Sequence, residues 1–480
     1  MRTITCEHLI ADPDAPPARA QQIGIADGRI VSVGVATGAV DPVLALPALV
    51  NAHDHGRAIR TSSIGAGGKP LESWLHYLAL FPSIDPYLAA AVALSRSALG
   101  GVGTVMMHYT RAQGFTDLPT EVAEVARAAR DVGLRVGFAV AMKDRHPLVY
   151  GPSEPLLAAL APDARAEIAA KFVRPPPSPA ELVALVDAVA ERAAGPGFDV
   201  QYGPNGPQWC SDALLTAVAE ASARTGRRIH MHLLETRYQR AFLDRAYPGG
   251  VVPHLNALGL LSPRLTLAHC VWARPDELAL LAERGVTISV NTSSNLHLRS
   301  GIAPLAAMLD AGCRVALGLD AGALDEDEDA LRELRLAHLL HVGTGFRVAA
   351  SRDKLLRAAF ATGRFSVTNT DDGGVVAPGA PADLLLLDWA AIDDDRLRDD
   401  LDPLTLALNR ATAHHVRELI VGGRTVVKDG AVTGVDYPAA RAEVLAQTRA
   451  GMAANAALAR VMPAHERALA AHFEPDCPCV

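Results

Sequence analysis

Two histidines separated by one residue follow an apolar run in the first part of the chain. The run is Leu46-Pro47-Ala48-Leu49-Val50-Asn51-Ala52, and His53-Asp54-His55 comes directly after it. Such a run predicts a buried strand, in which side chains two residues apart point to the same side. His53 and His55 would therefore project together from the end of the strand, which is the geometry that two imidazoles need to bind one divalent metal ion.

Three later apolar runs also end in groups that bind metals or transfer protons. The first contains His230 and His232 and leads to Glu235; the next two end at His269 and at Asp320. Because His230 and His232 lie on one face of the predicted strand, the spacing leaves open which of them would be a metal ligand. Each motif taken alone also has a structural explanation, such as a histidine in the core or an aspartate that caps a helix.

Strand-like and helix-like segments alternate through residues 47–365, and this alternation predicts a (β/α)8 TIM-like barrel. The strand-like segments are Gly103–His108, Val136–Ala141, Val200–Asn205, Ile229–Leu233, Leu265–His269, Val286–Val290 and Val315–Leu319. The helix-like segments are Glu121–Val132, Pro179–Ala194, Ser211–Thr225, Pro275–Arg284 and Ile302–Ala311. A barrel of this kind places its active site at the carboxyl ends of its strands, where the four motifs lie.

The two ends of the chain read as β structure. Asp27-Gly28 is a strong hairpin signal, and a second hairpin is expected within 419–430. We expect residues 1–46 and 366–435 to form one small discontinuous β-sandwich domain, and residues 436–480 to form a C-terminal helix and a tail.

Bulk composition excludes several classes of protein. The chain has 480 residues, a formal net charge of −8 and 20% charged residues, which disfavours nucleic acid and anionic membranes as partners. No signal peptide and no uncharged apolar run of about 18 residues is found, so no membrane span is expected. The six scattered cysteines fit reduced thiols in the cytoplasm. We expect a small-molecule substrate and a homodimer or higher homo-oligomer.

Taken together, the four motifs predict one metal centre. Three or more histidine and aspartate side chains at the ends of different strands of one barrel would converge within a few ångströms. A ligand set of imidazoles and one carboxylate suits Zn²⁺, with Fe²⁺ as the alternative. A water molecule in an open coordination position would have its pKa lowered towards about 7.

The order of these motifs resembles the amidohydrolase superfamily, and most closely its cytosine deaminase/chlorohydrolase-like branch of metal-dependent aminohydrolases. The resemblance rests on His53-x-His55, His232-x-x-Glu235, Leu267-Ala268-His269 and Gly318-x-Asp320, inside a barrel flanked by two β-rich ends. Supporting stretches are Leu258–Leu261, Ser293–Leu296 with Gly301, and Ala377–Asp383.

The resemblance implies a role for each residue of these motifs. One metal ion would be held by His53, His55, His232 and Asp320, which selects His232 over His230. Asp320 would take a proton from metal-bound water, and the resulting hydroxide would attack an amidine-like ring carbon. Glu235 would protonate the ring nitrogen and His269 would stabilise the adduct, with release of ammonia or an amine. No lysine occupies the expected fourth strand end, which argues against a dinuclear site with a carboxylated lysine.

The substrate is less clearly encoded than the chemistry. Many relatives have a histidine in the loop after the fourth strand, where this chain has Gly203-Pro204-Asn205-Gly206-Pro207-Gln208-Trp209. Candidate substrate contacts are Trp74, His108, Asn205, Gln208 and Trp209. Asp320-Ala321-Gly322-Ala323 also departs from the usual Ser or Asn after the aspartate, and the acidic run 325–329 reads as a solvated helix start.

The leading hypothesis is therefore hydrolytic deamination of a small amino-substituted N-heterocycle, which would be a purine, a pyrimidine or a triazine-like ring. The same site could instead open a cyclic amide or remove halide from such a ring. A hypothesis from another class is a metal-binding scaffold without turnover. Glu235 and His269 speak against it, because a structural zinc site needs no proton shuttle.

Overall fold

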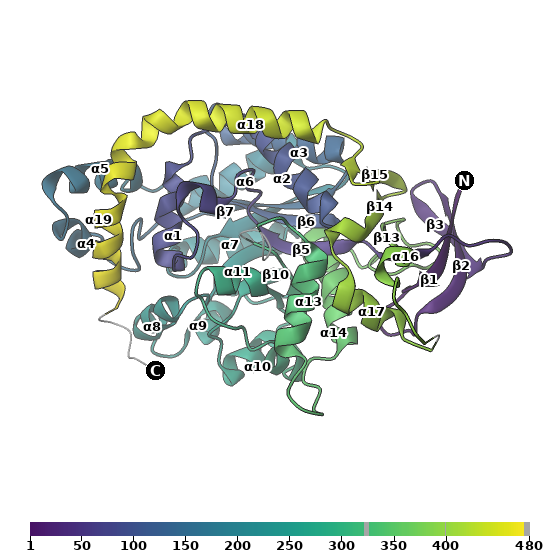
Figure 1. The fold of residues 1–480 in the computed structure, drawn as a ribbon. Helices are drawn as coiled ribbons and strands as arrows, with labels where there is room; N and C mark the ends of the chain where they lie inside the picture. Colours follow the sequence, from purple (N-terminus) through teal and green to yellow (C-terminus); the bar gives the residue numbers. More distant parts are fainter. Residues whose placement is uncertain (321–325, 399, 475–480) are drawn as a thin grey trace.

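A barrel of parallel strands forms the centre of the computed structural model, which describes residues 1–320, 326–398 and 400–474 (Figure 1). The barrel strands are β5 (Leu49–Asp54), β6 (Val102–Tyr109), β7 (Arg135–Met142), β8 (Phe198–Pro204), β9 (Ile229–Leu233), β10 (Leu265–His269), β11 (Thr287–Val290) and β12 (Arg314–Leu317). They pair in chain order, each parallel to the next. Their side chains are almost all buried, as expected for strands covered on both faces.

The barrel closes where the chain leaves β12. The backbone N–H of Asp320 donates to the carbonyl of His53 at 2.8 Å, and Asp54 and Asp320 form a parallel bridge. Asn51 supports this contact, because its side-chain oxygen accepts a hydrogen bond from the N–H of Leu319 at 2.8 Å. The first and last strands are thus joined at the residues that carry two of the predicted motifs.

Helices cover the outside of the barrel and follow its strands. After β5 come α1 (Leu71–Tyr77) and α2 (Pro86–Leu99), after β6 comes α3 (Leu118–Val132), and after β7 come α4 (Glu154–Ala158), α5 (Pro162–Phe172) and α6 (Pro179–Ala193). The later ones are α7 (Asp212–Thr225), α8 (Arg237–Ala246), α9 (Val251–Ala257), α10 (Pro275–Glu283), α11 (Thr292–His297), α12 (Leu305–Asp310), α13 (Ala330–His341), α14 (Arg352–Arg357) and α15 (Gly363–Thr368).

Local sequence signals explain where several of these helices begin and end. Ser178 and Glu181 form a capping box at the start of α6, with Pro179 at its first position. Ser211 caps α7, which ends at Gly226 in the left-handed conformation that favours glycine.

A second sheet lies beside the barrel and contains strands from both ends of the chain, at the right of Figure 1. Its strands are β1 (Arg2–Leu9), β2 (Ala18–Ala26), β3 (Arg29–Val35), β4 (Val43–Pro47), β13 (Leu384–Asp388), β14 (Val416–Val421), β15 (Arg424–Lys428) and β16 (Ala431–Val432). Their order is β16-β15-β14-β13-β4-β1-β2-β3, and the helices α16 (Trp389–Ile392) and α17 (Pro403–Arg410) follow β13. The fold class predicted from the sequence is confirmed, whereas the exact domain boundaries stay a prediction.

The C-terminal segment differs from the single helix that the sequence predicts. It forms α18 (Tyr437–Gly451) and α19 (Ala456–Phe473), which run across the top and left side of the barrel in Figure 1. A 3₁₀ turn over Met452–Asn455 joins the two helices. Just before it, a Cβ atom at Gly451 would lie 2.5 Å from Cβ of Pro82, so the close approach to Pro82 requires glycine here. A small residue at this position lets the chain turn closely around the barrel. In the described part of the chain, no helix is long and apolar enough to cross a membrane.

The acidic run was expected to be a solvated helix start, and its described residues are only partly so. Asp329 does cap α13, where it accepts hydrogen bonds from the N–H groups of Leu331 and Arg332 at 3.1 Å each, but it is fully buried. Glu328 is buried as well, and Glu326 accepts hydrogen bonds from Thr61 and Ser62. Residues 321–325 and the tail 475–480 lie outside the described residues.

The barrel and the second sheet are joined by a buried ion cluster around Asp383. Its carboxylate accepts hydrogen bonds from Arg135 at 2.9 Å, from Arg364 at 2.7 Å and from the N–H of Gly422 at 2.6 Å. Arg364 is only 5% exposed, and its charge is compensated by this carboxylate and by Asp372, which lies 3.1 Å from its guanidinium.

We predict that Asp383→Ala lowers the free energy of unfolding by about 3 kcal/mol, because it removes the buried carboxylate that Arg135 and Arg364 share, while Asp372 still pairs with Arg364. Urea denaturation followed by circular dichroism measures the change. The matched control is Asp400→Ala, which removes an exposed ion pair with Arg398 and should have little effect. Equal effects of the two substitutions would contradict the prediction.

Candidate active site and metal centre

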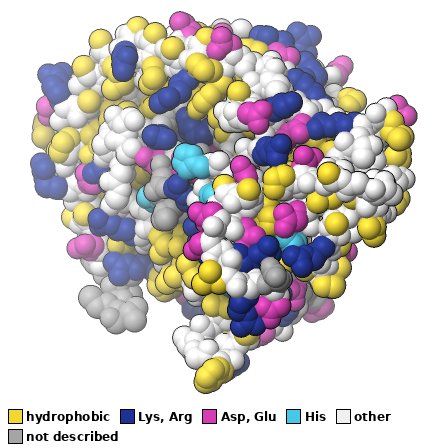
Figure 2. Space-filling view, turned by 45° about the vertical axis from the view of Figure 1, so that its right-hand side comes forward, with side chains coloured by type: hydrophobic (Ala, Val, Ile, Leu, Met, Phe, Trp, Pro, Cys, Tyr) yellow, Lys and Arg dark blue, Asp and Glu magenta, His cyan; other side chains and the backbone are white. Residues whose placement is uncertain are grey.

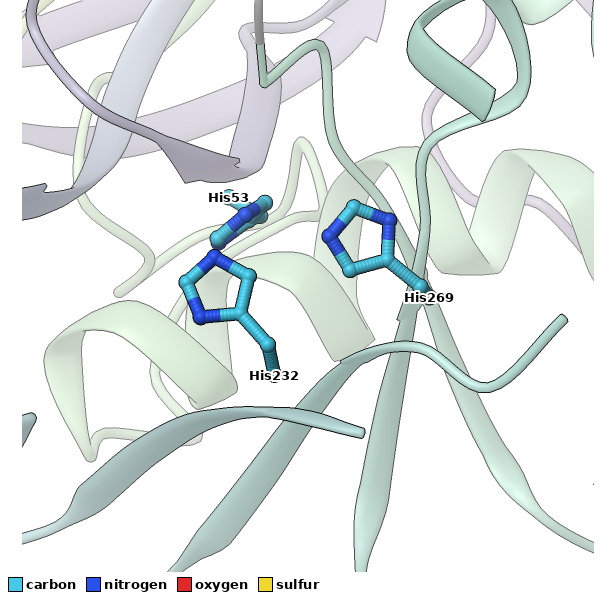
Figure 3. A group of neighbouring side chains, drawn as sticks. All are labelled: His53, His232 and His269. Carbon is cyan, nitrogen blue, oxygen red and sulfur yellow. The ribbon is translucent and has the colours of Figure 1, made fainter. Parts of the chain in front are cut away.

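Six side chains from four strand ends converge at the carboxyl end of the barrel. His53 lies near the end of β5, and His55 directly follows that strand. His232 lies in β9 and Glu235 shortly after it. His269 is the last residue of β10, and Asp320 lies in the segment after β12. Figure 3 shows the rings of His53, His232 and His269 turned towards one another. A cavity of about 960 Å³ opens over the group and reaches His55, His232, Glu235, His269 and Asp320.

The distances between these side chains suit a metal site. Asp320 Oδ1 lies 3.1 Å from His55 Nε2 and 3.5 Å from His53 Nε2, and these three residues could together hold one ion. His53, His232 and His269 form a second overlapping group of possible ligands. On the other side of the centre, His269 Nε2 lies 3.6 Å from Glu235 Oε2 and 3.9 Å from Asp320 Oδ2.

Each histidine ring is held by its Nδ1 atom, so that its Nε2 atom faces the centre. His55 Nδ1 donates to the carbonyl of His108 at 2.8 Å, and His232 Nδ1 donates to the carbonyl of Asn205 at 2.9 Å. His53 Nδ1 lies 2.7 Å from Nε2 of His230. Hydrogen bonds of this kind fix the tautomer and the orientation of metal-binding histidines.

The contact of His269 is of the same type, because its Nδ1 lies 2.9 Å from the side-chain oxygen of Asn295. In its neutral form, His269 therefore presents a lone pair on Nε2 towards the centre.

Polar atoms at the centre have no hydrogen-bond partner in the described part of the protein. These atoms are Nε2 of His53, Nε2 of His269 and Oε1 of Glu235, and all three are buried. Buried polar atoms are normally paired, so an unpaired group of them points to a missing ligand. Imidazole nitrogens together with one carboxylate are the donor set of a catalytic zinc-type site, and the residues present thus fit a divalent metal ion.

The backbone is strained at the same place. His269 has a φ of 75° and Asp320 a φ of 59°, both in the left-handed region that non-glycine residues rarely adopt. Such conformations cost roughly 1–3 kcal/mol each and concentrate at functional sites. The strain turns both side chains out of the strand direction towards the centre.

Burial disfavours the charged form of three site histidines, His53, His232 and His269. Desolvation lowers the pKa of His53 and of His232 well below the usual value, and the neighbouring histidines lower both further. The pKa of His269 is also lowered, mainly by burial. Neutral imidazoles are the form that binds a metal ion.

The two carboxyl groups are shifted in opposite directions. Burial, together with the charges of Asp320 and Glu72, raises the pKa of Glu235 well above its usual value. Burial acts in the same sense on Asp320, but its contact with His55 and the positive charge of Arg57 lower its pKa below the usual range. A pair of carboxyl groups with separated pKa values is suited to act as one proton donor and one proton acceptor.

The candidate substrate contacts fall into two groups. Trp74, Asn205 and Trp209 line the cavity. His108 and Gln208 are fully buried and are not among the residues that line it. His108 packs beside His232 with a ring-centroid separation of 4.9 Å, and its Nε2 donates to the carbonyl of Gly203 at 3.0 Å.

Several residues around the site were given no role by the sequence. Ser294 donates to Asp320 Oδ2 at 2.6 Å and its neighbour Asn295 holds His269, so the short helix α11 positions two site residues. The Ser293–Leu296 stretch was noticeable in the sequence only as a supporting motif. Glu72 is buried in the cavity wall, where it accepts hydrogen bonds from Thr236 and Tyr150. No spacing pattern marks Glu72.

Comparison with known proteins gives a family match over most of the chain. The model of the amidohydrolase family matches residues 44–432. The 5′-deoxyadenosine deaminase of Methanosarcina barkeri is 29% identical over 437 residues, covering 89% of this chain and 93% of that protein. The 5-methylthioadenosine/S-adenosylhomocysteine deaminase of Thermococcus sibiricus is 29% identical over 382 residues, covering 79% and 82% of the two chains.

Solved structures share the fold. An adenosine deaminase from Xanthomonas campestris with bound zinc superimposes with a TM-score of 0.76 at 23% identity, covering 94% of this chain and 98% of the other. Atrazine chlorohydrolase from Arthrobacter aurescens, in complex with zinc and atraton, also has a TM-score of 0.76, at 24% identity and with 94% and 100% coverage.

We predict that the purified protein binds about one divalent metal ion per chain and that His55→Ala lowers this content severalfold, because the change removes one imidazole from the donor set. Inductively coupled plasma mass spectrometry measures the metal content. His414→Ala, at an exposed histidine outside the site, is the control and should keep the full content. Unchanged metal in His55→Ala would contradict the assignment of the centre.

Proposed function

The chain belongs to the amidohydrolase family, and we propose that it is a metal-dependent hydrolytic deaminase of an amino-substituted N-heterocycle. The observation that carries the proposal is the meeting of Glu235, His269 and Asp320 with three further histidines at one end of the cavity. Relatives named as deaminases of adenine nucleosides and an adenosine deaminase of the same fold support this reaction class.

The metal ligands in this proposal are His53, His55, His232 and Asp320. Zinc is the preferred ion, because the donor set is rich in imidazole and the structural neighbours contain zinc. A bound divalent ion would supply a water molecule whose pKa is lowered to about 7 and thus a nucleophile at neutral pH. His230 is not assigned as a ligand, since its Nε2 contacts His53 instead of the centre.

Protein groups carry the protons of the reaction. Asp320 is ionised at neutral pH and accepts a proton from the attacking water. Glu235, whose raised pKa favours its protonated form, delivers a proton to the ring nitrogen next to the attacked carbon. Asp320 then passes its proton to the departing amine, which leaves as ammonia. The hydroxyl proton of the adduct returns to Glu235, so that the amidine carbon ends as a carbonyl and both carboxyl groups regain their starting state.

His269 orients the water and steadies the adduct. Because Asn295 engages its Nδ1, the neutral ring accepts a hydrogen bond from the attacking water at Nε2. Once protonated, the same nitrogen donates to the oxygen of the tetrahedral adduct, where charge develops. Interactions with a charge that develops in the transition state are those that accelerate a reaction.

The cavity supports a ring substrate. Trp74 and Trp209 offer flat apolar surfaces, and Asn205 offers an amide for hydrogen bonds to ring nitrogens. Removal of halide from a triazine is the second candidate, favoured by the fold shared with atrazine chlorohydrolase. Ammonia and halide release, measured across purines with their nucleosides, pyrimidines and triazines, separates the two reactions. The cytoplasmic location and the homo-oligomeric state stay predictions.

We predict that Glu235→Gln keeps the metal content but lowers kcat by about 10²–10⁴-fold, because the amide cannot shuttle a proton. Single-turnover assays with the best substrate of the screen, together with metal analysis of the same sample, measure both quantities. The control is Glu220→Gln, which makes the same change at an exposed glutamate and should keep the wild-type kcat. A Glu235→Gln variant with most of its kcat would exclude the proposed role.

We predict that Asn295→Ala lowers kcat by about 10–100-fold and leaves the metal content unchanged, because it frees the ring of His269 without removing a metal ligand. The control is the exposed Asn409→Ala on α17, which should keep the wild-type kcat. Loss of metal in Asn295→Ala would instead indicate that His269 is itself a ligand.

A further inference from the structure

The cavity is larger than a bare heterocycle requires. Its volume of about 960 Å³ lies at the upper end of the range of about 300–1,000 Å³ for sites of drug-sized ligands. Glu235, His269 and Asp320 occupy one end. The wall continues over the segments after β6 and β7, as far as Pro175–Pro177 in the loop that precedes α6.

Positively charged side chains gather on this second part of the wall. Lys143 follows the last residue of β7 directly, Lys171 lies in the last turn of α5, and Arg174 follows that helix. Arg111, after β6, also lines the cavity. The pKa of Lys171 is lowered by burial and then by the charges of Arg111 and Arg174, so these three side chains lie within electrostatic reach of one another.

Three of these cations have no acidic partner among the described residues. No hydrogen bond or ion pair to a described group is found for Lys143, Lys171 or Arg174. The side chains of these three residues are exposed. In contrast, Arg111 donates to the carbonyl of Phe81 at 2.5 Å, and Arg145 donates to the carbonyl of Pro207 at 2.6 Å.

The acidic residues of the same wall are engaged elsewhere. Asp144 accepts hydrogen bonds from the N–H and the hydroxyl of Ser211 at 2.7 and 2.5 Å. Glu72 is held by Thr236 and Tyr150, and burial raises its pKa. The cavity therefore contains free positive charge in a protein whose overall charge is −8.

This concentration of one charge differs from the outer surface. On the face shown in Figure 2, Lys and Arg side chains alternate with Asp and Glu side chains and with hydrophobic ones. A cleft lined by one sign of charge attracts ligands of the opposite sign. Lys143, Lys171 and Arg174 are exposed and have no acidic partner among the described residues, so they can form charge-assisted hydrogen bonds with an anion that enters the cavity.

We propose that the substrate of this enzyme is an amino-substituted heterocycle that carries an anionic substituent, either a carboxylate or a phosphate, and that Lys143, Lys171 and Arg174 bind this group. This inference rests on the proposed deaminase function and names its substrate class. The ring lies at Glu235, His269 and Asp320, and the substituent extends towards the loops after β6 and β7. The three successive prolines 175–177 restrict the backbone next to Arg174 and so limit its movement.

The test compares substrates that differ only in charge. The heterocycle that releases ammonia in the screen is assayed in its neutral form, with a carboxylate and with a phosphate; for adenosine, these are the nucleoside, its 5′-carboxylate and its 5′-monophosphate. We expect kcat/KM to be at least tenfold higher for one charged form than for the neutral one, and the better of the two identifies the anion. The KM of that form should rise with ionic strength, because salt screens the attraction.

Two charge-removing variants, one conservative variant and one control test whether these side chains bind the anion. Lys143→Met and the double variant Lys171→Met/Arg174→Met each remove positive charge from the wall. Each should reduce the ratio of kcat/KM for the charged substrate to kcat/KM for the neutral substrate by about ten- to hundredfold, because each removes a charge-assisted hydrogen bond. Lys143→Arg should restore most of the ratio. Lys354→Met, at an exposed lysine of α14, removes the same charge outside the cavity and should leave the ratio unchanged.

The possible failures can be told apart. If the neutral substrate is turned over but neither charged form is preferred, or if both wall variants keep the wild-type ratio, the anionic substrate is excluded while the deaminase function stands. If no heterocycle, charged or neutral, releases ammonia, the proposed function is overturned and this inference falls with it.

Discussion

The active site depends on how the barrel closes. One backbone hydrogen bond, from the N–H of Asp320 to the carbonyl of His53, joins the last strand segment to the first. The same two residues supply a carboxylate and an imidazole to the proposed metal centre. Closing the sheet therefore also brings together ligands that lie far apart in the sequence. A closed barrel has no free edge, so these ligands cannot separate without breaking the packing of the parallel strands.

The histidine cluster follows from this closure and creates an electrostatic problem. His53, His55, His232 and His269 lie within a few ångströms of one another in a buried site, where several imidazolium charges would repel. Burial lowers the pKa of His53, His232 and His269, which favours their neutral form, and hydrogen bonds engage the Nδ1 atoms. The carbonyls of His108 and Asn205 can only accept, so the tautomers of His55 and His232 are fixed. The lone pairs that remain point inwards, which is what a cation needs.

The sequence predicts the barrel and the six central residues because both depend on short-range regularities. An apolar run closed by His, Glu or Asp is visible without any tertiary information, as at His269 and Asp320. Contacts that depend on side-chain direction are not visible: Asn295 of α11 contacts His269, and Glu72 of α1 contacts Thr236. Lys143 is an intermediate case. It follows the apolar run of β7 just as Asp320 follows that of β12. Its proposed role in binding an anion can be inferred only from the structure, which places Lys171 and Arg174 in the same cavity wall.

The residues proposed to react and the residues proposed to bind the substrate lie on different parts of the fold, so the substrate can change while the reaction stays the same. The strand ends hold the reacting groups, whereas the far wall of the cavity comes from α1, α5 and the loops around them. These elements rest on the C-terminal helix α19. His465 lies 2.5 Å from His76 of α1, and Glu466 binds Lys69 at 2.7 Å. Phe473, near the end of α19, reaches the cavity itself. The last helix of the chain thus supports the wall that we propose to contact the substrate, so substitutions there should alter which molecule is bound without disturbing the barrel.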